Sequence, residues 1–149
     1  MKIAIGSDHG GYCLKEALIE YLKREKHNII DVGCFCAEGC DYPEYGFKVA
    51  QLVSKKKASR GIVICKSGIG SSMVANKAKG VRAALCSNLA QAKSSRQHND
   101  ANVLVFGALY AKKETAKKMV SLWLKTKALG GRHSRRVKQI IQTEKKLFR

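Results

Sequence analysis

The chain is short of proline, of aromatic side chains and of acidic residues, and each shortage narrows its class. It holds one proline in 149 residues, and Phe, Trp and Tyr together make up 7%. With 45% hydrophobic residues, the composition is neither that of a disordered tail nor that of a fibrous protein. We therefore expect a folded chain, and its length favours one domain that spans residues 1–149.

Long apolar runs are missing as well. No stretch approaches the roughly 20 apolar residues that a transmembrane helix requires. The first residues, Met1–Gly6, form an apolar run too short for a secretory signal peptide. We expect a soluble, cytoplasmic protein whose six cysteines are reduced thiols.

The shortage of acidic residues leaves a large positive charge. The chain has 29 Lys and Arg against 11 Asp and Glu, a formal charge of +18, and the excess lies in its second half. Such a field attracts anions, from sugar phosphates to nucleic acid. The chain has no recognised nucleic-acid-binding motif and no basic strand with interleaved aromatics. A nucleic-acid-binding module is therefore the remote alternative, and nucleic acid is not the partner we expect.

Apolar runs and helical patterns alternate along the whole chain. The expected strands are 2–7, 27–32, 61–65, 81–85 and 102–106. Three expected helices begin after residues 10–11, after the loop 33–43 and after the turn 66–72, and the third of them runs through residue 77. Two more helices cover 89–97 and 112–125, and a basic helical tail follows residues 130–131. This alternation predicts an α/β fold: a Rossmann-like open parallel sheet in a three-layer αβα sandwich, with a C-terminal basic helix. Ligands of such sheets bind beyond the carboxyl ends of the strands.

One loop at that edge, Gly68-Ile69-Gly70-Ser71-Ser72, joins the most strand-like run to a helix. Unpaired backbone N–H groups and the helix dipole converge there, so the turn can hold an anion. The segment has neither the lysine-serine pair of a P-loop nor the pattern G-x-G-x-x-G, so it is not a nucleotide fingerprint. The alternative is a tight turn in which Ser71 or Ser72 caps the helix.

Cys65 stands at the end of that strand, directly before the helix. The helix dipole and the adjacent Lys66 should favour its thiolate, which makes it the best nucleophile or base among the cysteines. Free cysteines are more often inert core residues, and Cys13 and Cys86 fit that interpretation.

The loop 33–43 carries three closely spaced cysteines, Cys34, Cys36 and Cys40. Their C-x-C-x3-C spacing lacks the paired C-x2-C pattern and the fourth ligand of a structural zinc site. We therefore expect no metal.

Polar residues at element ends are further candidates. Asp8 and His9 end the first strand ahead of two glycines that let a ligand approach the backbone, or else Asp8 caps the first helix. His98 ends a helix, where an imidazole also complements the dipole. Arg132 and Arg136 lie on one helical face at i, i+4 and can clamp a phosphate, the alternative being a solvated basic tail.

Together, these motifs resemble a known family. They are Gly6-Ser7-Asp8-His9-Gly10-Gly11, residues 65–70, Asn76-Lys77, residues 82–86, residues 98–103 and Gly130-Gly131-Arg132-His133. In this order, from Lys2 to about Ile141, the chain is similar to type B ribose-5-phosphate isomerases. That family also holds galactose-6-phosphate and allose-6-phosphate isomerases.

The resemblance implies a Rossmann-like fold in a homodimer that can pair into a tetramer, with each site built from two subunits. It implies interconversion of ribose 5-phosphate and ribulose 5-phosphate, a step of the pentose phosphate pathway, without metal or organic cofactor. An isomerase of a six-carbon sugar phosphate, such as allose 6-phosphate, is the alternative, because the sequence does not reveal pocket length.

The resemblance also implies residue roles. Cys65 matches the base that removes the proton next to the carbonyl, with Ser67 hydrogen-bonded to it, and His98 matches the acid that opens the furanose ring. The substrate-binding residues implied are Asp8, His9, Lys66, Gly68, Ile69, Gly70, Ser71 and Asn99, with Arg132 and Arg136 on the phosphate.

Two positions depart from the family pattern. Lys66 replaces a glycine that commonly follows the cysteine, which alters the backbone approach to the substrate. Leu109 stands where many members have an arginine that helps to hold the substrate. With that arginine absent, the resemblance leaves the phosphate more dependent on Arg132 and Arg136.

Overall fold

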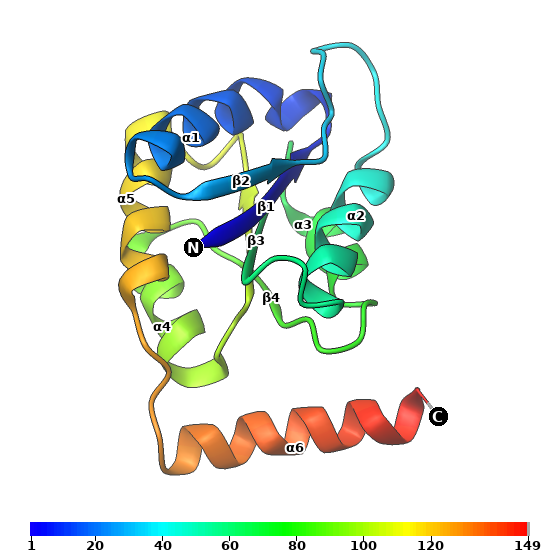
Figure 1. Ribbon diagram of the computed structural model, residues 1–149, viewed down its shortest axis with the longest axis vertical. Helices are drawn as coiled ribbons and strands as arrows, with labels where there is room; N and C mark the ends of the chain where they lie inside the picture. Colours follow the sequence, from blue (N-terminus) through cyan, green and yellow to red (C-terminus); the bar gives the residue numbers. More distant parts are fainter. Residues whose placement is uncertain (149) are drawn as a thin grey trace.

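The computed structural model describes residues 1–148, so Arg149, the last residue of the expected domain, lies outside the described part. Strands and helices alternate as expected (Figure 1). The strands are β1 (Lys2–Ser7), β2 (Asn28–Asp31), β3 (Arg60–Cys65), β4 (Ala83–Leu85) and β5 (Val103–Gly107). The helices are α1 (Tyr12–Arg24), α2 (Tyr42–Ser54), α3 (Ile69–Ala75), α4 (Leu89–Asn99), α5 (Lys113–Lys125) and α6 (Arg132–Leu147), and a 3-10 turn covers His9–Gly11. Within residues 1–148, no helix is both long and apolar enough to cross a membrane.

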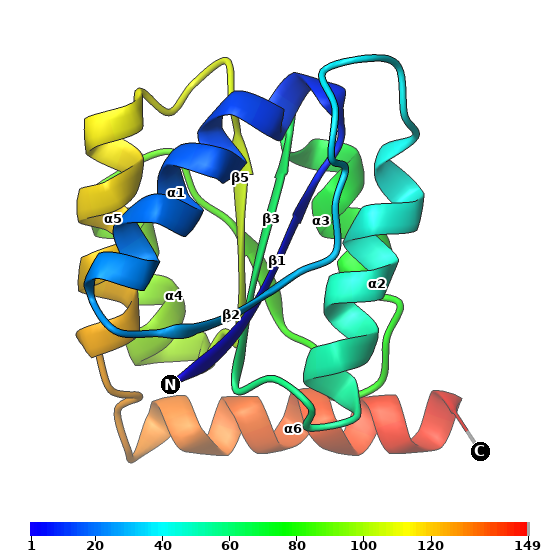
Figure 2. The same ribbon diagram turned by 45° about the horizontal axis from the view of Figure 1, so that its top comes forward.

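The strands form one parallel sheet in the order β2-β1-β3-β5-β4. In Figure 2, α1, α4 and α5 cover one face of this sheet, and α2 and α3 cover the other. The three-layer αβα prediction is therefore confirmed. Because every strand points the same way, all carboxyl ends meet at one edge, the edge at which Cys65 ends β3.

Alternate residues of the central strands build two separate cores. Ile5, Ile62 and Leu104 point toward α1 and α5, where Trp123 is fully buried. Val63 and Val105 point the opposite way, toward α2 and α3. Each large side chain that is fully buried contributes about 1.5–3 kcal/mol, so the central strands are the rigid part of the molecule.

Several expected boundaries shift by one to three residues. α2 begins at Tyr42 instead of after Pro43, because a proline fits the first turn of a helix, where its missing N–H costs nothing. α3 ends at Ala75 instead of Lys77, and β4 begins at Ala83 instead of Val81. α4 continues to Asn99, so His98 lies inside the helix.

The basic tail is a helix, α6, which crosses the molecule at the amino ends of the strands (Figure 1). None of its residues is buried. Between α6 and the sheet lies a groove of about 460 Å3, lined on the helix by apolar residues that include Ile140, Leu147 and Phe148. The Glu144 carboxylate attaches α6 to the loop before β4, because it accepts a hydrogen bond from the backbone N–H of Gly80 at 2.7 Å.

Candidate active site

The backbone around Cys65 holds its thiol in one place. The side chain is 4% exposed, and the backbone N–H of Gly68 donates a hydrogen bond to Sγ at 3.0 Å. Such a donor stabilises negative charge on sulfur. Gly68 reaches back to the thiol because its φ is +82°, in the left-handed region that favours glycine. A Cβ on Gly68 would collide with the Leu85 side chain, and one on Gly107 would collide with the Ser67 carbonyl.

The turn after Cys65 begins α3 without a side-chain cap. Its N-cap residue is Gly68, so the prediction that Ser71 or Ser72 caps the helix is wrong. The left-handed backbone of Gly68 already sets the helix start, and Ser72 Oγ donates instead to the Ile69 carbonyl at 2.7 Å. Ser71 Oγ is buried and has no hydrogen-bond partner within residues 1–148.

Ser67 lies in the same turn but points its hydroxyl elsewhere. Its Oγ accepts a hydrogen bond from the backbone N–H of Ile69 at 3.3 Å. The hydrogen bond to Cys65 that the resemblance implies is therefore not among the hydrogen bonds of Ser67 Oγ in the described chain. Ser67 nevertheless stays two residues from the thiol, in the turn that forms the floor of the site.

Asp8 is buried and caps the 3-10 turn, as one of the two interpretations of this residue predicts. Its Oδ1 accepts from the backbone N–H of Gly11 at 3.0 Å, and its own N–H donates to the Ile64 carbonyl at 3.2 Å. The second bond attaches the β1 loop to the strand that carries Cys65. His9 is exposed, and its Nδ1 accepts from the backbone N–H of Cys40 at 3.3 Å.

A cleft of about 610 Å3 opens beside the turn. It is lined by Ser67, Ile69, Leu85, Cys86, Ser87, Gln91, Gly107 and Tyr110. A volume of this size fits a small-molecule substrate. The sequence patterns did not single out Tyr110, which is 65% exposed at the rim; its position three residues after Gly107, the carboxyl-end glycine of β5, is the one signal that points to it.

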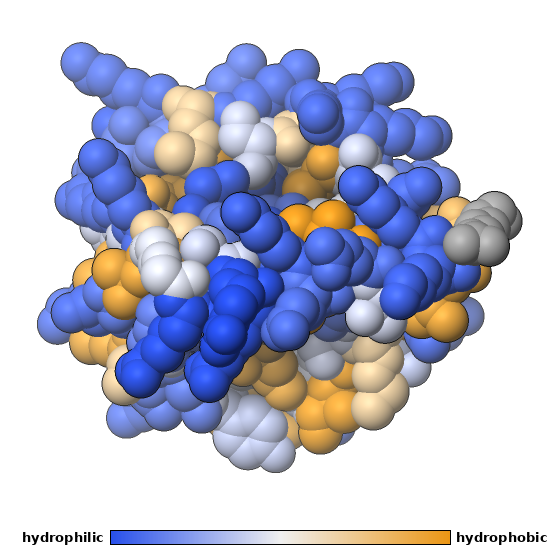
Figure 3. Space-filling view, turned by 90° about the horizontal axis from the view of Figure 1, so that it is seen from below, coloured by the Kyte–Doolittle hydropathy of each residue, from blue (hydrophilic) through white to orange (hydrophobic). Residues whose placement is uncertain are grey.

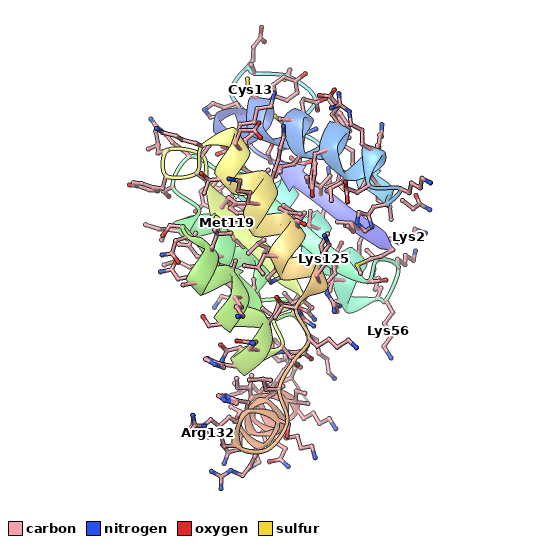
Figure 4. The ribbon with its side chains drawn as sticks, turned by 90° about the vertical axis from the view of Figure 1, so that its left-hand side faces the viewer. Lys2, Cys13, Lys56, Met119, Lys125 and Arg132 are labelled. Carbon is pink, nitrogen blue, oxygen red and sulfur yellow. The ribbon has the colours of Figure 1, made fainter. Side chains whose placement is uncertain are left out.

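The other cysteines divide into two groups. Cys86 is buried, and burial raises the pKa of its thiol while a hydrogen bond with Ser95 acts in the opposite direction; the prediction that it is a core residue is confirmed, and it also lines the cleft. Cys13 is exposed, so the same interpretation is wrong for it. It lies in the first turn of α1, at the end of the molecule where that helix projects past the sheet (Figure 4).

Cys34, Cys36 and Cys40 lie together in the loop between β2 and α2. Burial raises the pKa of Cys40 to about 12, and the neighbouring Cys34 thiol adds to the shift. A thiol with that pKa stays protonated at neutral pH and is a poor ligand and nucleophile. Over residues 1–148, no three His, Cys, Asp or Glu side chains are grouped as a metal site requires.

A second cluster of candidates lies at the amino end of the sheet. α4 runs antiparallel to the strands, so it brings His98 and Asn99 to that edge, where Arg132 begins α6. The rings of His98 and His133 stack, with their centroids 4.3 Å apart and an interplanar angle of 9°. Burial lowers the pKa of His133, and the charges of His98, Arg132 and Arg136 lower it further. The smaller contribution from these neighbouring charges reflects a positive local potential, which favours a bound phosphate.

Buried and half-buried arginines fix the end of α4 that carries His98. Asp100, with φ +47°, ends the helix and pairs with Arg96 at 2.6 Å and with Arg82 at 2.9 Å. The backbone N–H of Leu129 donates to the Gln97 carbonyl at 2.9 Å, which attaches the segment leading to α6. The sequence patterns missed both Asp100 and His133 as parts of this cluster. The signal for each was its place in a motif next to His98 or Arg132.

One chain does not bring the two clusters together. Asp8, His9 and the turn 65–71 lie at the carboxyl end of the sheet, and His98, Asn99, Arg132 and Arg136 lie at the amino end. In Figure 4, Arg132 is at the opposite end of the molecule from Cys13, which begins α1 beside the carboxyl edge. Strands of five to six residues keep the two ends roughly 16–20 Å apart.

Comparisons with known proteins show the family of the chain. The family model described as Ribose/Galactose Isomerase matches residues 3–140. Ribose-5-phosphate isomerase B of Escherichia coli is 43% identical over 97% of both chains. A structure of Clostridium thermocellum ribose-5-phosphate isomerase B superposes with a TM-score of 0.96 at 48% identity, covering 99% of both chains. A structure of the Mycoplasma genitalium enzyme with bound ribulose-5-phosphate gives a TM-score of 0.93 at 41% identity, covering 97% of this chain and 96% of that one. With a family model covering most of its length and relatives this similar, the chain belongs to the ribose/galactose isomerase family.

Proposed function

We propose that this protein is a type B ribose-5-phosphate isomerase, which interconverts D-ribose 5-phosphate and D-ribulose 5-phosphate in the non-oxidative branch of the pentose phosphate pathway. The observation that carries the proposal is the position of the Cys65 thiol. It lies at the carboxyl end of β3, it accepts a hydrogen bond from the Gly68 N–H, and the turn that follows it lines a cleft of substrate size. The 41% identity to a protein whose structure holds ribulose-5-phosphate supports it. We place the enzyme in the cytoplasm as a single domain.

Cys65 transfers the proton. Its thiolate removes the proton from C2 of the open-chain aldose, and the bonding electrons move toward the C1 carbonyl, which gives a 1,2-enediolate. The hydroxyl proton on the C2 oxygen moves to the C1 oxygen, so the negative charge shifts to the C2 oxygen. The thiol then returns the proton to C1 as the C2 oxygen becomes the ketone and the C1 oxygen a hydroxyl. Proton transfer of this kind needs no metal and no organic cofactor, only a poised base and donors for the oxyanion.

The turn after Cys65 and the β1 loop bind the sugar. Backbone N–H groups of the turn stabilise the enediolate, and the unpartnered Ser71 hydroxyl, which is buried, offers a further donor. Ser67 supports Cys65 in catalysis. The substrate-binding residues of this half are Asp8, His9, Lys66, Gly68, Ile69, Gly70 and Ser71.

The second cluster opens the sugar ring and holds the phosphate. His98 protonates the ring oxygen with Asn99 beside it, and Arg132 and Arg136 bind the phosphate dianion. Because one chain keeps these residues a sheet length from Cys65, a pentose phosphate cannot reach both within a protomer. The active form is therefore a homodimer, or a tetramer of paired dimers, in which each site combines the Cys65 half of one protomer with the Arg132 half of its partner.

A six-carbon sugar phosphate such as allose 6-phosphate is the second candidate substrate. The family description names galactose beside ribose, and the cleft of about 610 Å3 has room for one more carbon. Leu109 stands where an arginine is common in the family. Its side chain is 63% exposed just after β5 and is not among the residues that line the cleft, so it does not restrict the length of the substrate.

Turnover of the two sugar phosphates by the purified protein tests the proposal. We expect kcat/KM for ribose 5-phosphate to exceed that for allose 6-phosphate by at least about tenfold, because one misplaced carbon displaces the reacting atoms from Cys65. The Cys65→Ala protein serves as the inactive control. A tenfold preference for the hexose overturns the substrate, and no turnover of either sugar overturns the activity.

A further inference from the structure

Six exposed lysines lie on the underside of the molecule, the side that also carries the His98–Arg132 cluster, but toward the C-terminal end of α6. They come from three segments: Lys55, Lys56 and Lys57 after α2, Lys79 before β4, and Lys145 and Lys146 on α6. We call this group the basal lysine cluster. Figure 3 shows this side, with α6 across its centre and mostly hydrophilic side chains around it.

Two hydrogen bonds join the three segments. Ser54 Oγ, at the end of α2, donates to the Lys79 carbonyl at 2.6 Å, and the next residue, Gly80, donates its N–H to Glu144 on α6 at 2.7 Å. Figure 4 shows the Lys56 side chain directed toward the α6 side of the molecule. The three segments that carry the six lysines are therefore attached to one another on this side of the molecule.

This surface has no acidic partner for its lysines, unlike the surroundings of Lys15, Lys48 and Lys117, the three lysines that form ion pairs within residues 1–148. Lys48 pairs with Glu44 at 2.5 Å and Lys117 with Glu114 at 2.9 Å, whereas none of the six basal lysines forms an ion pair within residues 1–148. The one acid in segments 55–57, 76–80 and 138–148 is Glu144, and its carboxylate already accepts from Gly80. Six ammonium groups without counter-charges repel one another, and a bound polyanion would relieve that repulsion.

The cluster is separate from the phosphate-binding half of the proposed site. Lys145 follows Arg132 by 13 residues and Arg136 by nine on the same helix, and at 1.5 Å per residue it lies about 20 Å and about 14 Å from them along the helix axis. A sugar phosphate bound by Arg132 therefore does not neutralise the basal lysines. Their charge remains to be explained by a different ligand.

The shape of the surface selects the kind of polyanion. Proteins that bind single-stranded nucleic acid stack its bases on aromatic rings, but the three segments carry one aromatic residue, Phe148, which lines the groove between α6 and the sheet. Helices that bind membranes insert an apolar face, but Ile140 and Leu147 of α6 also line that groove. What remains is an array of point charges suited to the phosphates of a duplex.

We propose that the basal lysine cluster docks the phosphate backbone of a double-stranded nucleic acid, without reading its sequence. Duplex RNA and duplex DNA present the same phosphate chemistry to this surface. Six lysine–phosphate contacts predict that the logarithm of the binding constant falls with the logarithm of salt concentration with a slope of about −5.

Fluorescence anisotropy with labelled 20-base-pair duplexes of RNA and of DNA, between 50 and 200 mM salt, tests the proposal. The test variant is Lys79→Gln/Lys145→Gln/Lys146→Gln, and the matched control is Lys23→Gln/Lys113→Gln/Lys118→Gln, which removes three exposed lysines from α1 and α5. We expect the test variant to bind at least about tenfold more weakly at 100 mM salt, with a slope smaller by about 3. The control variant should keep the wild-type slope to within about one. Thermal unfolding and isomerase turnover, measured on both variants, show that the fold and the active site are unchanged.

Three results overturn the proposal. The first is no binding of either duplex at 50 mM salt. The second is an equal loss in both variants, which assigns the binding to net charge and not to this surface. The third is binding to vesicles that contain anionic lipid with none to duplex, which assigns the cluster to a membrane. These readouts do not depend on catalysis, so they stand whether or not the proposed isomerase activity is found.

Discussion

The two ends of the sheet differ in how firmly they hold their chemical groups. At the carboxyl end, Cys65 and Asp8 are buried, and backbone hydrogen bonds fix both. At the amino end, Arg132 and Arg136 are exposed on a helix with no buried residue. The carboxyl end is organised within one chain, whereas the amino end presents its charges outward.

The difference matches the two tasks that the proposed reaction sets. Proton transfer needs a base held within a fraction of an ångström, and that precision comes from strands packed on both faces. Phosphate binding tolerates longer and more mobile side chains, because a dianion attracts guanidinium groups from several directions. In the proposed function, the carboxyl end therefore carries the proton transfer, and the amino end carries phosphate binding and ring opening.

The largest expected effect comes from removing the thiol. Cys65→Ala should lower kcat by at least about a thousandfold, because it deletes the group that moves the proton. The fold should survive, since the change removes one sulfur atom and leaves the Gly68 turn in place. Steady-state kinetics and circular dichroism measure the two effects, with Cys34→Ala, a buried cysteine outside the cleft, as a control for loss of a buried thiol. Turnover near that of the wild type would exclude Cys65 as the base.

Mixing two inactive variants sharpens the comparison further. Cys65→Ala and His98→Ala each damage a different end of the sheet, so a dimer with one chain of each kind contains one site with both halves intact. Random pairing makes half of the dimers mixed, and one of their two sites works, so coexpression should restore about a quarter of wild-type activity. Coexpressing Cys65→Ala with a Cys65→Ser chain is the matched control, because neither of its sites is intact. Activity no higher than that of the separate variants would show that each site lies within one chain.

The smallest expected effect concerns the phosphate. Arg132→Ala or Arg136→Ala should raise KM by about 10- to 100-fold, the value of one charge-assisted hydrogen bond pair, and should weaken inhibition by inorganic phosphate in proportion. kcat should fall less, because the base remains in place. Arg135→Ala removes an arginine from the same helical turn and should leave both constants within about twofold. If Arg132→Ala and Arg136→Ala behave like Arg135→Ala, the helix is a solvated basic tail and the phosphate is held elsewhere.

Local patterns in the sequence predicted the fold well because each element repeats a simple period. The run Gly61-Ile62-Val63-Ile64-Cys65 has the β-branched content of a buried parallel strand, and the spacing of Leu14, Leu18 and Leu22 is that of a helix face. The same reasoning placed Cys65 and the Gly68 turn at the carboxyl edge. Boundaries failed where a terminus depends on one backbone angle, as at the left-handed Gly68.

Long-range contacts could not be predicted in this way. His98 and His133 are 35 positions apart and meet only because the end of α4 packs beside the start of α6. The Asp100 ion pair with Arg82, 18 positions away, likewise depends on how a strand start and a helix end are arranged in space. Cys13 lies on the same helix face as the buried Ala17. It is exposed because of where α1 begins relative to the sheet, and the spacing of apolar residues in the sequence does not determine that position.

Backbone crowding around the thiol also matters to anyone who wishes to redesign this protein. A Cβ on Gly68 would collide with the backbone of Gly107, and a Cβ on Gly107 would collide with the backbone of Ser67. In random mutagenesis, we therefore expect neither glycine to tolerate any other amino acid. We expect the substrate range to change through Leu85 and Tyr110 at the rim of the cleft, because their exposed side chains can be replaced without a clash. A library that keeps both glycines and varies the rim would explore new sugars without displacing the base.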